Sequence, residues 1–118
     1  MSTQVPDNPA MIEQELRKLI TWITEAVTAC HHAYQAKLAA EHEYRVAYAR
    51  AYVNATGPQQ EKRYRADLAT ITEASARDVT DAAHRYAMDK QRALRDRLEA
   101  TRSLSASIRE SYRASGVL

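Results

Sequence analysis

Apolar residues recur along the first half of the chain at steps of three and four residues, the spacing of one helical face. Asn8 followed by Pro9 is typical of a helix start, with Asn as N-cap and Pro in the first turn. We therefore predict one long helix that starts at Asn8-Pro9 and is held for more than ten turns. Its face comprises Ile12, Leu16, Ile20, Ile23, Val27, Cys30, Tyr34, Leu38, Arg45, Tyr48 and Tyr52, with Tyr44 displaced from it.

A second helical face follows in the other half of the chain and has a smaller, more polar middle. We predict a second helix that starts at Pro58 or Gln59 and runs to about Ala106 or beyond. Small side chains suit close packing of helix backbones. This face comprises Tyr64, Leu68, Ile71, Ser75, Val79, Ala82, Tyr86, Ala93 or Leu94, Leu98, Thr101, Ser105, Ile108 and Tyr112.

The tripeptide Thr56-Gly57-Pro58 separates the two faces. Gly adopts the left-handed conformation that ends helices, and Pro cannot donate the next backbone hydrogen bond. A connection this short predicts helices that fold back on each other. The predicted fold is all-α: an antiparallel helical hairpin over residues 9–106 with its turn at 56–58, after a disordered lead-in over 1–8 and before a helical or frayed tail over 107–118.

Folding at Gly57 brings the two apolar faces into register along their length. The predicted neighbours are Tyr48 and Leu68, Tyr34 and Val79 or Ala82, Cys30 and His84, Ile20 and Leu94, and Leu16 and Leu98. The second helix then extends past the first from about Ser103.

Two helices alone bury little surface, and the first is apolar over more than one stripe near its start. Leu16, Leu19, Trp22 and Ile23 form the candidate oligomer seam. We expect a homodimer or higher oligomer, with two hairpins forming a four-helix bundle. The alternative is a monomeric antiparallel coiled coil whose open end is covered by Trp22.

Composition supports a helical chain of one domain. The 118 residues include no Phe and carry a net charge of +2. A single Cys excludes an internal disulfide and suits a reducing compartment. No apolar run approaches the ~18–20 residues that span a membrane, and no secretory signal precedes the first helix. We expect a cytoplasmic protein without membrane contact.

Candidate chemistry is sparse. Folding brings His84 near Cys30 and His31, a pairing of soft ligands that could hold a metal; the alternative is that these histidines lie at the seam or on the surface. Cys30 on an apolar face behaves as a small hydrophobic residue, without a base or oxyanion site to activate it. We expect no catalytic residue, no metal and no cofactor.

An arginine row is the most informative polar feature: Arg85, Arg92, Arg95, Arg102, Arg109 and Arg113 share one side of the second helix. Such a row could follow a phosphate backbone. The alternative is a solvated face, because Arg85, Arg92 and Arg95 each precede an acid by four residues. Arg102, Arg109 and Arg113 remain free in this pattern. The candidate nucleic-acid or partner-binding residues are Arg95, Arg102, Arg109, Tyr112 and Arg113.

Several helical strings carry a resemblance to a known group: Ala47-Tyr48-Ala49-Arg50-Ala51-Tyr52, the Gly57 turn, Glu61-Lys62-Arg63, Ala66-Asp67-Leu68-Ala69-Thr70, Ala93-Leu94-Arg95-Asp96-Arg97-Leu98 and Arg102-Ser103-Leu104. Residues 38–109 resemble small helical-hairpin proteins of tailed phages and prophages, especially those of actinobacteria. The resemblance implies a non-enzymatic protein of the host cell cytoplasm, encoded near phage recombination or replication genes.

Two functions follow as hypotheses. The first is a non-enzymatic phage or prophage protein that acts by protein–protein interaction in DNA recombination or replication. The alternative is a nucleic-acid-binding accessory protein that uses the arginine row of the second helix.

Overall fold

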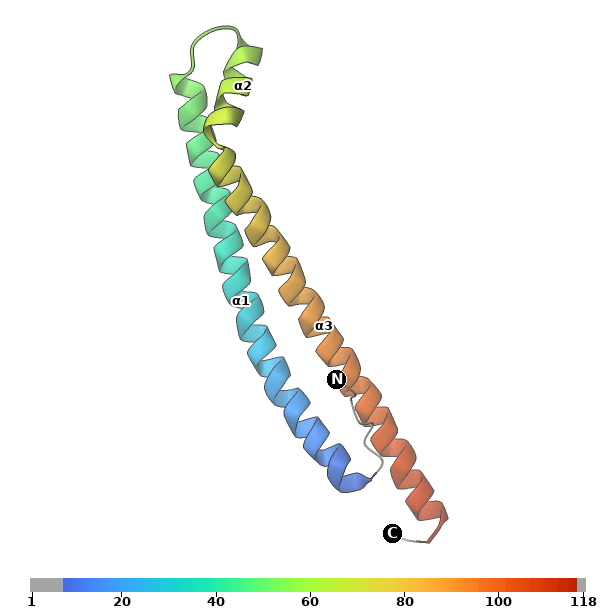
Figure 1. Ribbon diagram of the computed structural model, residues 1–118. Coiled ribbons are helices and arrows are strands. Elements are labelled where there is room, and N and C mark those ends of the chain that lie inside the picture. Colours follow the sequence, from blue (N-terminus) through green and yellow to red (C-terminus); the bar gives the residue numbers. More distant parts are fainter. Residues whose placement is uncertain (1–7, 117–118) are drawn as a thin grey trace. The chain divides into compact units, whose positions relative to one another are not determined.

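The computed structural model describes residues 8–116, which form three α-helices and no strand: α1 (Pro9–Asn54), α2 (Gln59–Ala69) and α3 (Ile71–Ala114) (Figure 1). The predicted all-α class is confirmed. The tail expected to be helical or frayed is helical up to Ala114. Most of the predicted lead-in and the last two residues of the chain lie outside the described part.

The start of α1 is fixed by the predicted cap. The backbone N–H of Met11 donates to Oδ1 of Asn8 at 2.9 Å, and the N–H of Ile12 donates to the Asn8 carbonyl at 3.0 Å. The side chain thus satisfies one of the N–H groups that a helix leaves without an internal partner at its first turn. Asn8 and Pro9 have the roles that their sequence predicted.

The predicted connection at 56–58 is also present. Gly57 has a φ of +107°, a conformation that side chains disfavour, and Pro58 precedes α2 in an extended conformation. Nη1 of Arg65 donates to Oγ1 of Thr56 at 3.2 Å, so the first turns of α2 hold the connection. Pro58 lies just before the helix, and α2 begins at Gln59, as expected.

The predicted single second helix is wrong, because Thr70 interrupts it. The Thr70 hydroxyl donates to the Ala66 carbonyl at 2.7 Å, whereas the Thr70 N–H donates to Asp67 O at 3.3 Å. The side chain has thus taken the carbonyl that its own N–H would bond in an α-helix, a competition known for Thr. Thr70 is 2% exposed, so the break is packed inside the protein.

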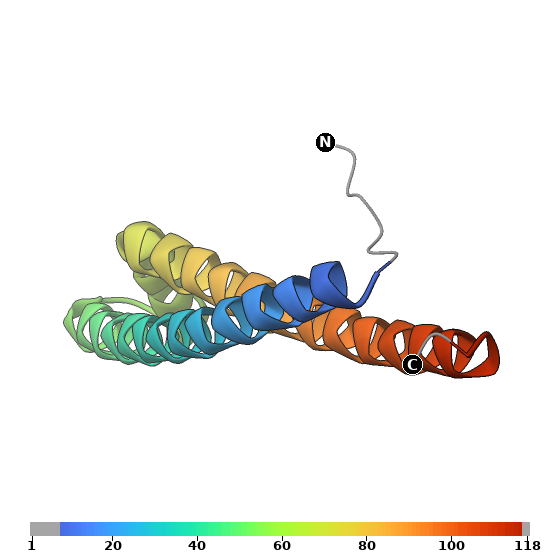
Figure 2. The ribbon, with the colours of Figure 1, turned by 90° about the horizontal axis from the view of Figure 1, so that it is seen from below.

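The chain forms two compact units. The terminal unit combines Met1–Thr28 with Asp89–Leu118, and the central unit is Ala29–Met88. In the terminal unit, Ile12, Leu19, Ala26 and Thr101 are buried. The Arg97 guanidinium pairs with Glu15 and lies 5.8 Å from the Trp22 ring centroid. The last turns of α3 extend past the start of α1 in both ribbon views, as the predicted overhang requires (Figure 1, Figure 2).

In the central unit, the second half of α1 contacts α2 and the first part of α3. The rings of Tyr34 and His84 lie 5.2 Å apart, Arg77 covers the Tyr44 ring at 4.1 Å, and Lys62 lies 5.3 Å from the Tyr52 ring. Tyr34 was expected beside Val79 or Ala82, so it meets a later residue of α3 than predicted, whereas Tyr52 and Lys62 keep the predicted register.

The least exposed residues of α1 repeat every seven positions. Ile12, Leu19, Ala26 and Ala40 are buried, and Ala33 is half-buried. A seven-residue repeat is the pattern of coiled-coil packing, and alanines allow the backbones to come close. The predicted face followed larger residues instead, and part of it is wrong: Ile20, Val27, Tyr34 and Leu38 are 43–55% exposed.

The predicted inner face of the second helix is also wrong within the central unit. Its residues Tyr64, Leu68, Ile71, Val79 and Tyr86 are 60–71% exposed. Within the terminal unit the prediction fares better. Thr101 is buried, and the other predicted face residues Leu94, Leu98, Ser105, Ile108 and Tyr112 are half-buried.

Candidate interaction surface

An apolar stripe lies on the solvent-exposed side of α2 and α3 in the central unit. We call it the outer stripe: Tyr64, Leu68, Ile71, Ser75, Val79, Ala82 and Tyr86, all exposed. The steps of four and three residues keep Ile71, Ser75, Val79, Ala82 and Tyr86 on one face of α3, whereas Tyr64 and Leu68 lie on α2, before the interruption at Thr70. The five large side chains of the outer stripe belong to the second apolar face predicted from the sequence, and they are exposed to solvent. Contiguous exposed apolar side chains are typical of an interaction surface.

The opposite side of α3, which is less exposed, is more polar than the outer stripe. Along it lie Thr70, Glu73, Arg77, Thr80 and His84, all buried or half-buried. Within the described residues, Oε2 of Glu73 and Nδ1 of His84 are buried without a hydrogen-bond partner. Burial of polar groups on one side and exposure of apolar side chains on the other are both unfavourable for a single chain in water.

Cross-helix polar contacts hold the inner side of the central unit. Nζ of Lys37 lies 3.4 Å from Oδ1 of Asp81, and the same carboxylate pairs with Arg85 at 2.8 Å. The Lys37 side chain is only 25% exposed, so this ion pair is better shielded than an ordinary surface pair. The inner side therefore has α1 as its partner, whereas the outer stripe has none in the described chain.

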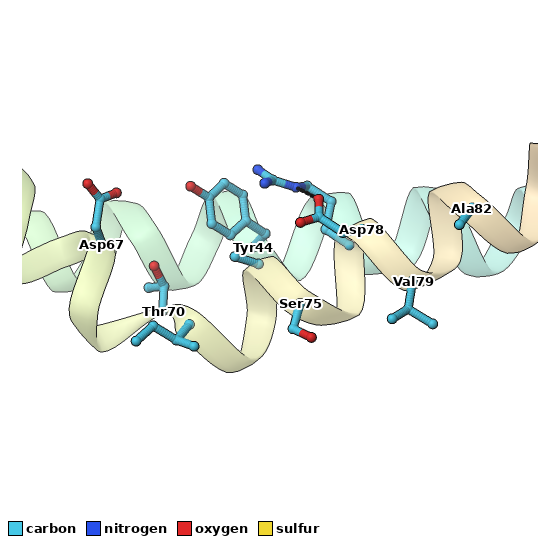
Figure 3. A pocket seen from close by; sticks show the side chains of 10 residues that line it. Tyr44, Asp67, Thr70, Ser75, Asp78, Val79 and Ala82 are labelled. Atoms are coloured by element: carbon cyan, nitrogen blue, oxygen red, sulfur yellow. Dashed lines mark hydrogen bonds and ion pairs between the residues drawn. The ribbon is translucent and has the colours of Figure 1, made fainter.

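A groove of about 640 Å³ runs along this part of α3 (Figure 3). Ser75 and Val79 of the outer stripe point away from Tyr44 (Figure 3). The Arg77 guanidinium lies over the Tyr44 ring, 4.1 Å from its centroid. Nε of Arg77 donates to Oδ1 of Asp78 at 3.3 Å. The full lining is Tyr44, Asp67, Thr70, Ile71, Ala74, Ser75, Arg77, Asp78, Val79 and Ala82.

The charge of Arg77 is secured by its neighbours. Desolvation, the largest single effect, works to lower the pKa of the guanidinium, but the Asp78 carboxylate and the Tyr44 hydroxyl together raise it above its ordinary value. Sequence reasoning missed this cluster and placed Tyr44 off the helix face, whereas Tyr44 is half-buried beside Arg77. The repeat of Thr70, Arg77 and His84 every seven residues was the signal that could have found it.

The candidate arginines lie exposed on α3 in the terminal unit. Two that were predicted to be free have acid partners one turn before them: Arg102 pairs with Glu99 at 3.2 Å, and Arg113 pairs with Glu110 at 3.8 Å. Arg109 donates to Oγ of Ser105 at 3.3 Å.

The predicted pairs with acids four residues later are wrong, since Arg85 pairs with Asp81 and Arg92 with Asp89. Arg95, predicted to pair with Glu99, has no ion pair within residues 8–116. Tyr112 is half-buried.

The candidate oligomer seam is largely used within the chain. Leu19 is fully buried in the terminal unit, and Leu16 and Ile23 are half-buried. Leu19 therefore cannot form part of a surface between copies in this structure, and only Trp22 remains exposed, at 40%. The sequence reasoning assigned these side chains to a partner copy, but all except Trp22 are buried or half-buried within the chain.

The residues proposed for metal binding do not gather into a ligand set. His84 contacts Tyr34, the rings of His31 and His32 lie 6.4 Å apart, and Cys30 is a half-buried free thiol. The described part of the chain contains no group of three or more His, Cys, Asp or Glu side chains placed to hold a metal ion. No helix within residues 8–116 is long and apolar enough to cross a membrane.

Fold and surface together define an all-α protein of long helices with an exposed apolar stripe. No protein-family model, curated protein or solved structure matches the chain.

Proposed function

We propose that the chain is a non-enzymatic helical protein that acts by protein–protein interaction and associates with itself through the outer stripe. The observation that carries this proposal is the exposure of Ile71 and Val79, at 61% and 64%, on α3, whose other side buries polar groups, together with the 71% exposure of Leu68 on α2. A second copy would remove these side chains from water. Self-association thus resolves the mismatch between the two sides of α3.

The contacts within each unit support an antiparallel helical hairpin as the single copy. In the central unit Tyr34 contacts His84, and Tyr44 contacts Arg77. The later residue of α1 thus contacts the earlier residue of α3, as in an antiparallel pair. Two such hairpins joined by their outer stripes would form a four-helix bundle, the common arrangement for helices of this kind. This assembly differs from the one centred on Leu19 and Trp22 that the sequence favoured.

Thermal unfolding tests self-association on the unmodified chain. If the folded state is a dimer, the Tm rises with protein concentration, because association stabilises only the folded form. Helicity followed by circular dichroism over a roughly hundredfold range of concentration should show a steady rise of several degrees. A Tm that stays constant over this range would refute the proposal.

The arginines of α3 support a second candidate function, sequence-independent binding of nucleic acid. The side chains of Arg102 and Arg113 are 58% and 76% exposed, and those of their acid partners are 72% and 73% exposed. Such pairs contribute only about 0.2–1 kcal/mol each, so a phosphate could replace them. Arg95 needs no exchange at all, because it has no ion pair within the described residues.

A salt titration with short DNA tests this second candidate. If the arginines bind phosphates, the affinity falls steeply with salt, and changing Arg95, Arg102 and Arg109 to Ala lowers the slope of log K against log salt by about three. A variant with Arg17, Lys18 and Arg50 of α1 changed to Ala removes equal charge elsewhere. Equal losses in both variants, or no binding at low salt, would exclude the arginine row as the binding site.

The biological setting of the proposed interaction stays a prediction. The resemblance to phage and prophage hairpin proteins suggests a role in DNA recombination or replication within the host cytoplasm. Capture of partners from an infected or lysogenic host tests that setting.

A further inference from the structure

Four arginines of α3 in the terminal unit share one side of the helix, and we call them the terminal row: Arg95, Arg102, Arg109 and Arg113. The steps of seven, seven and four residues keep their positions close together round the helix, and all four are exposed. Since an α-helix rises about 1.5 Å per residue, the row is about 27 Å long. That length corresponds to about eight base pairs of B-DNA.

The helix that carries the terminal row is held by a different side. Thr101 is buried and Ile108 is half-buried within the terminal unit, whereas the arginines of the row are exposed. The last turns of α3, which carry Arg109 and Arg113, extend past the start of α1 (Figure 1, Figure 2). The row is therefore a set of charges on one continuous helix, and a large ligand can reach it.

The terminal row offers charge without aromatic rings. Within the described part of the terminal unit, the aromatic residues are Trp22 and Tyr112. Trp22 lies on α1 beside Arg97, and Tyr112 is half-buried four residues after half-buried Ile108. Proteins that bind single-stranded nucleic acid stack bases on aromatic side chains, which contributes about 1–3 kcal/mol per base. The terminal row has no ring that could supply this contribution.

We propose that the terminal row binds the phosphate backbone of double-stranded DNA, independently of sequence and in preference to single strands. This inference rests on the second candidate function and specifies its ligand. A duplex presents about one phosphate per 1.7 Å of its axis at fixed positions, so the row meets a preformed array of charges. A single strand loses conformational freedom when it is ordered along α3, and no base stacking offsets that loss.

The side chains beside the terminal row argue against a lipid surface as the ligand. Helices that bind anionic membranes place large apolar side chains in the lipid next to their basic residues. The residues interspersed with the row are Glu99, Ala106 and Glu110, so this side of α3 has no large apolar side chain to insert. The two acids pair with arginines of the row, and their charge opposes an anionic surface.

Fluorescence anisotropy at low salt tests the preference with the full-length chain. The two probes are a mixed-sequence duplex of about 20 base pairs and an oligothymidine strand of about 40 nucleotides, which carry about equal numbers of phosphates. We expect the duplex to bind at least about fivefold more tightly. Changing Arg95, Arg102 and Arg109 to Ala should remove most of the duplex affinity, whereas the α1 variant with Arg17, Lys18 and Arg50 changed to Ala should retain it.

The possible results separate this inference from the function on which it rests. Equal or tighter binding of oligothymidine would overturn the duplex preference and leave nucleic-acid binding in place. If neither probe binds at low salt, both proposals fail. Vesicles of phosphatidylcholine and phosphatidylserine in equal amounts provide the third probe. Binding to them as tight as to the duplex, lost in the same row variant, would show a general anion surface and contradict the proposal.

Discussion

Val79→Glu should convert the associated protein to a folded monomer. Val79 is 64% exposed and lies on the outer stripe, so the substitution removes no packing within one copy. In the proposed assembly it buries two carboxylates against apolar side chains, which is costly without a partner charge. We expect self-association weaker by roughly 100-fold or more, measured by sedimentation velocity over a range of concentrations.

Ala76→Glu is the control for this prediction. Ala76 follows Ser75 and therefore lies about 100° round α3 from the centre of the outer stripe, and it is exposed. It introduces the same charge, and Glu suits a helix at least as well as Val does, so neither variant should lose helicity. Equal effects of the two substitutions on association would show that charge, and not the stripe, controls it.

Leu19→Ala should destabilise the fold more than any other single truncation in the terminal unit. Leu19 is completely buried there, in a chain with few buried large side chains. Removal of a buried Leu side chain costs about 2–5 kcal/mol, from lost burial and the cavity left behind. Urea unfolding at a matched protein concentration, followed by circular dichroism, would measure the loss of unfolding free energy.

Ile20→Ala provides the matched comparison. Ile20 is the next residue on α1 and is 55% exposed, so the same kind of truncation should cost well under half as much. If Ile20→Ala destabilised the protein as strongly as Leu19→Ala, the side of α1 that packs against α3 would be wrongly assigned. Both variants should retain the outer stripe and therefore associate when folded.

The local chemistry of Asn8, Pro9 and Gly57 was enough to predict the ends of α1 and the connection after it. Each of these residues acts through its own backbone or a neighbour three residues away, so no distant contact is needed. The all-α class followed from the same kind of local preference. Helix propensity and spacing specify such features within the sequence itself.

The buried faces could not be predicted in the same way, because alanines are buried between the helices while larger apolar residues are exposed. Ala26, Ala33 and Ala40 face the neighbouring helix, while Val27, Tyr34 and Leu38 remain more exposed. Hydrophobicity alone ranks these residues in the opposite order. The sequence does contain a seven-residue repeat of small side chains. Whether that repeat is buried depends on how closely two helices approach, which the sequence does not state.

Thr70 shows a second limit of sequence reasoning. Thr is tolerated in helices, and nothing in its neighbours signals a break. The interruption depends on the hydroxyl of Thr70 bonding the Ala66 carbonyl in a buried position. The candidate surface was nevertheless present in the sequence, because the stripe from Tyr64 to Tyr86 was found but assigned to α1 as its partner.

The molar mass of the chain in solution tests the central claim most directly. Sedimentation equilibrium of the unmodified protein, from low micromolar to high micromolar concentration, measures it without assumptions about shape. The proposed association of two copies predicts a mass that rises from 13.3 kDa towards twice that value. A single species of 13.3 kDa at every concentration would contradict self-association through the outer stripe.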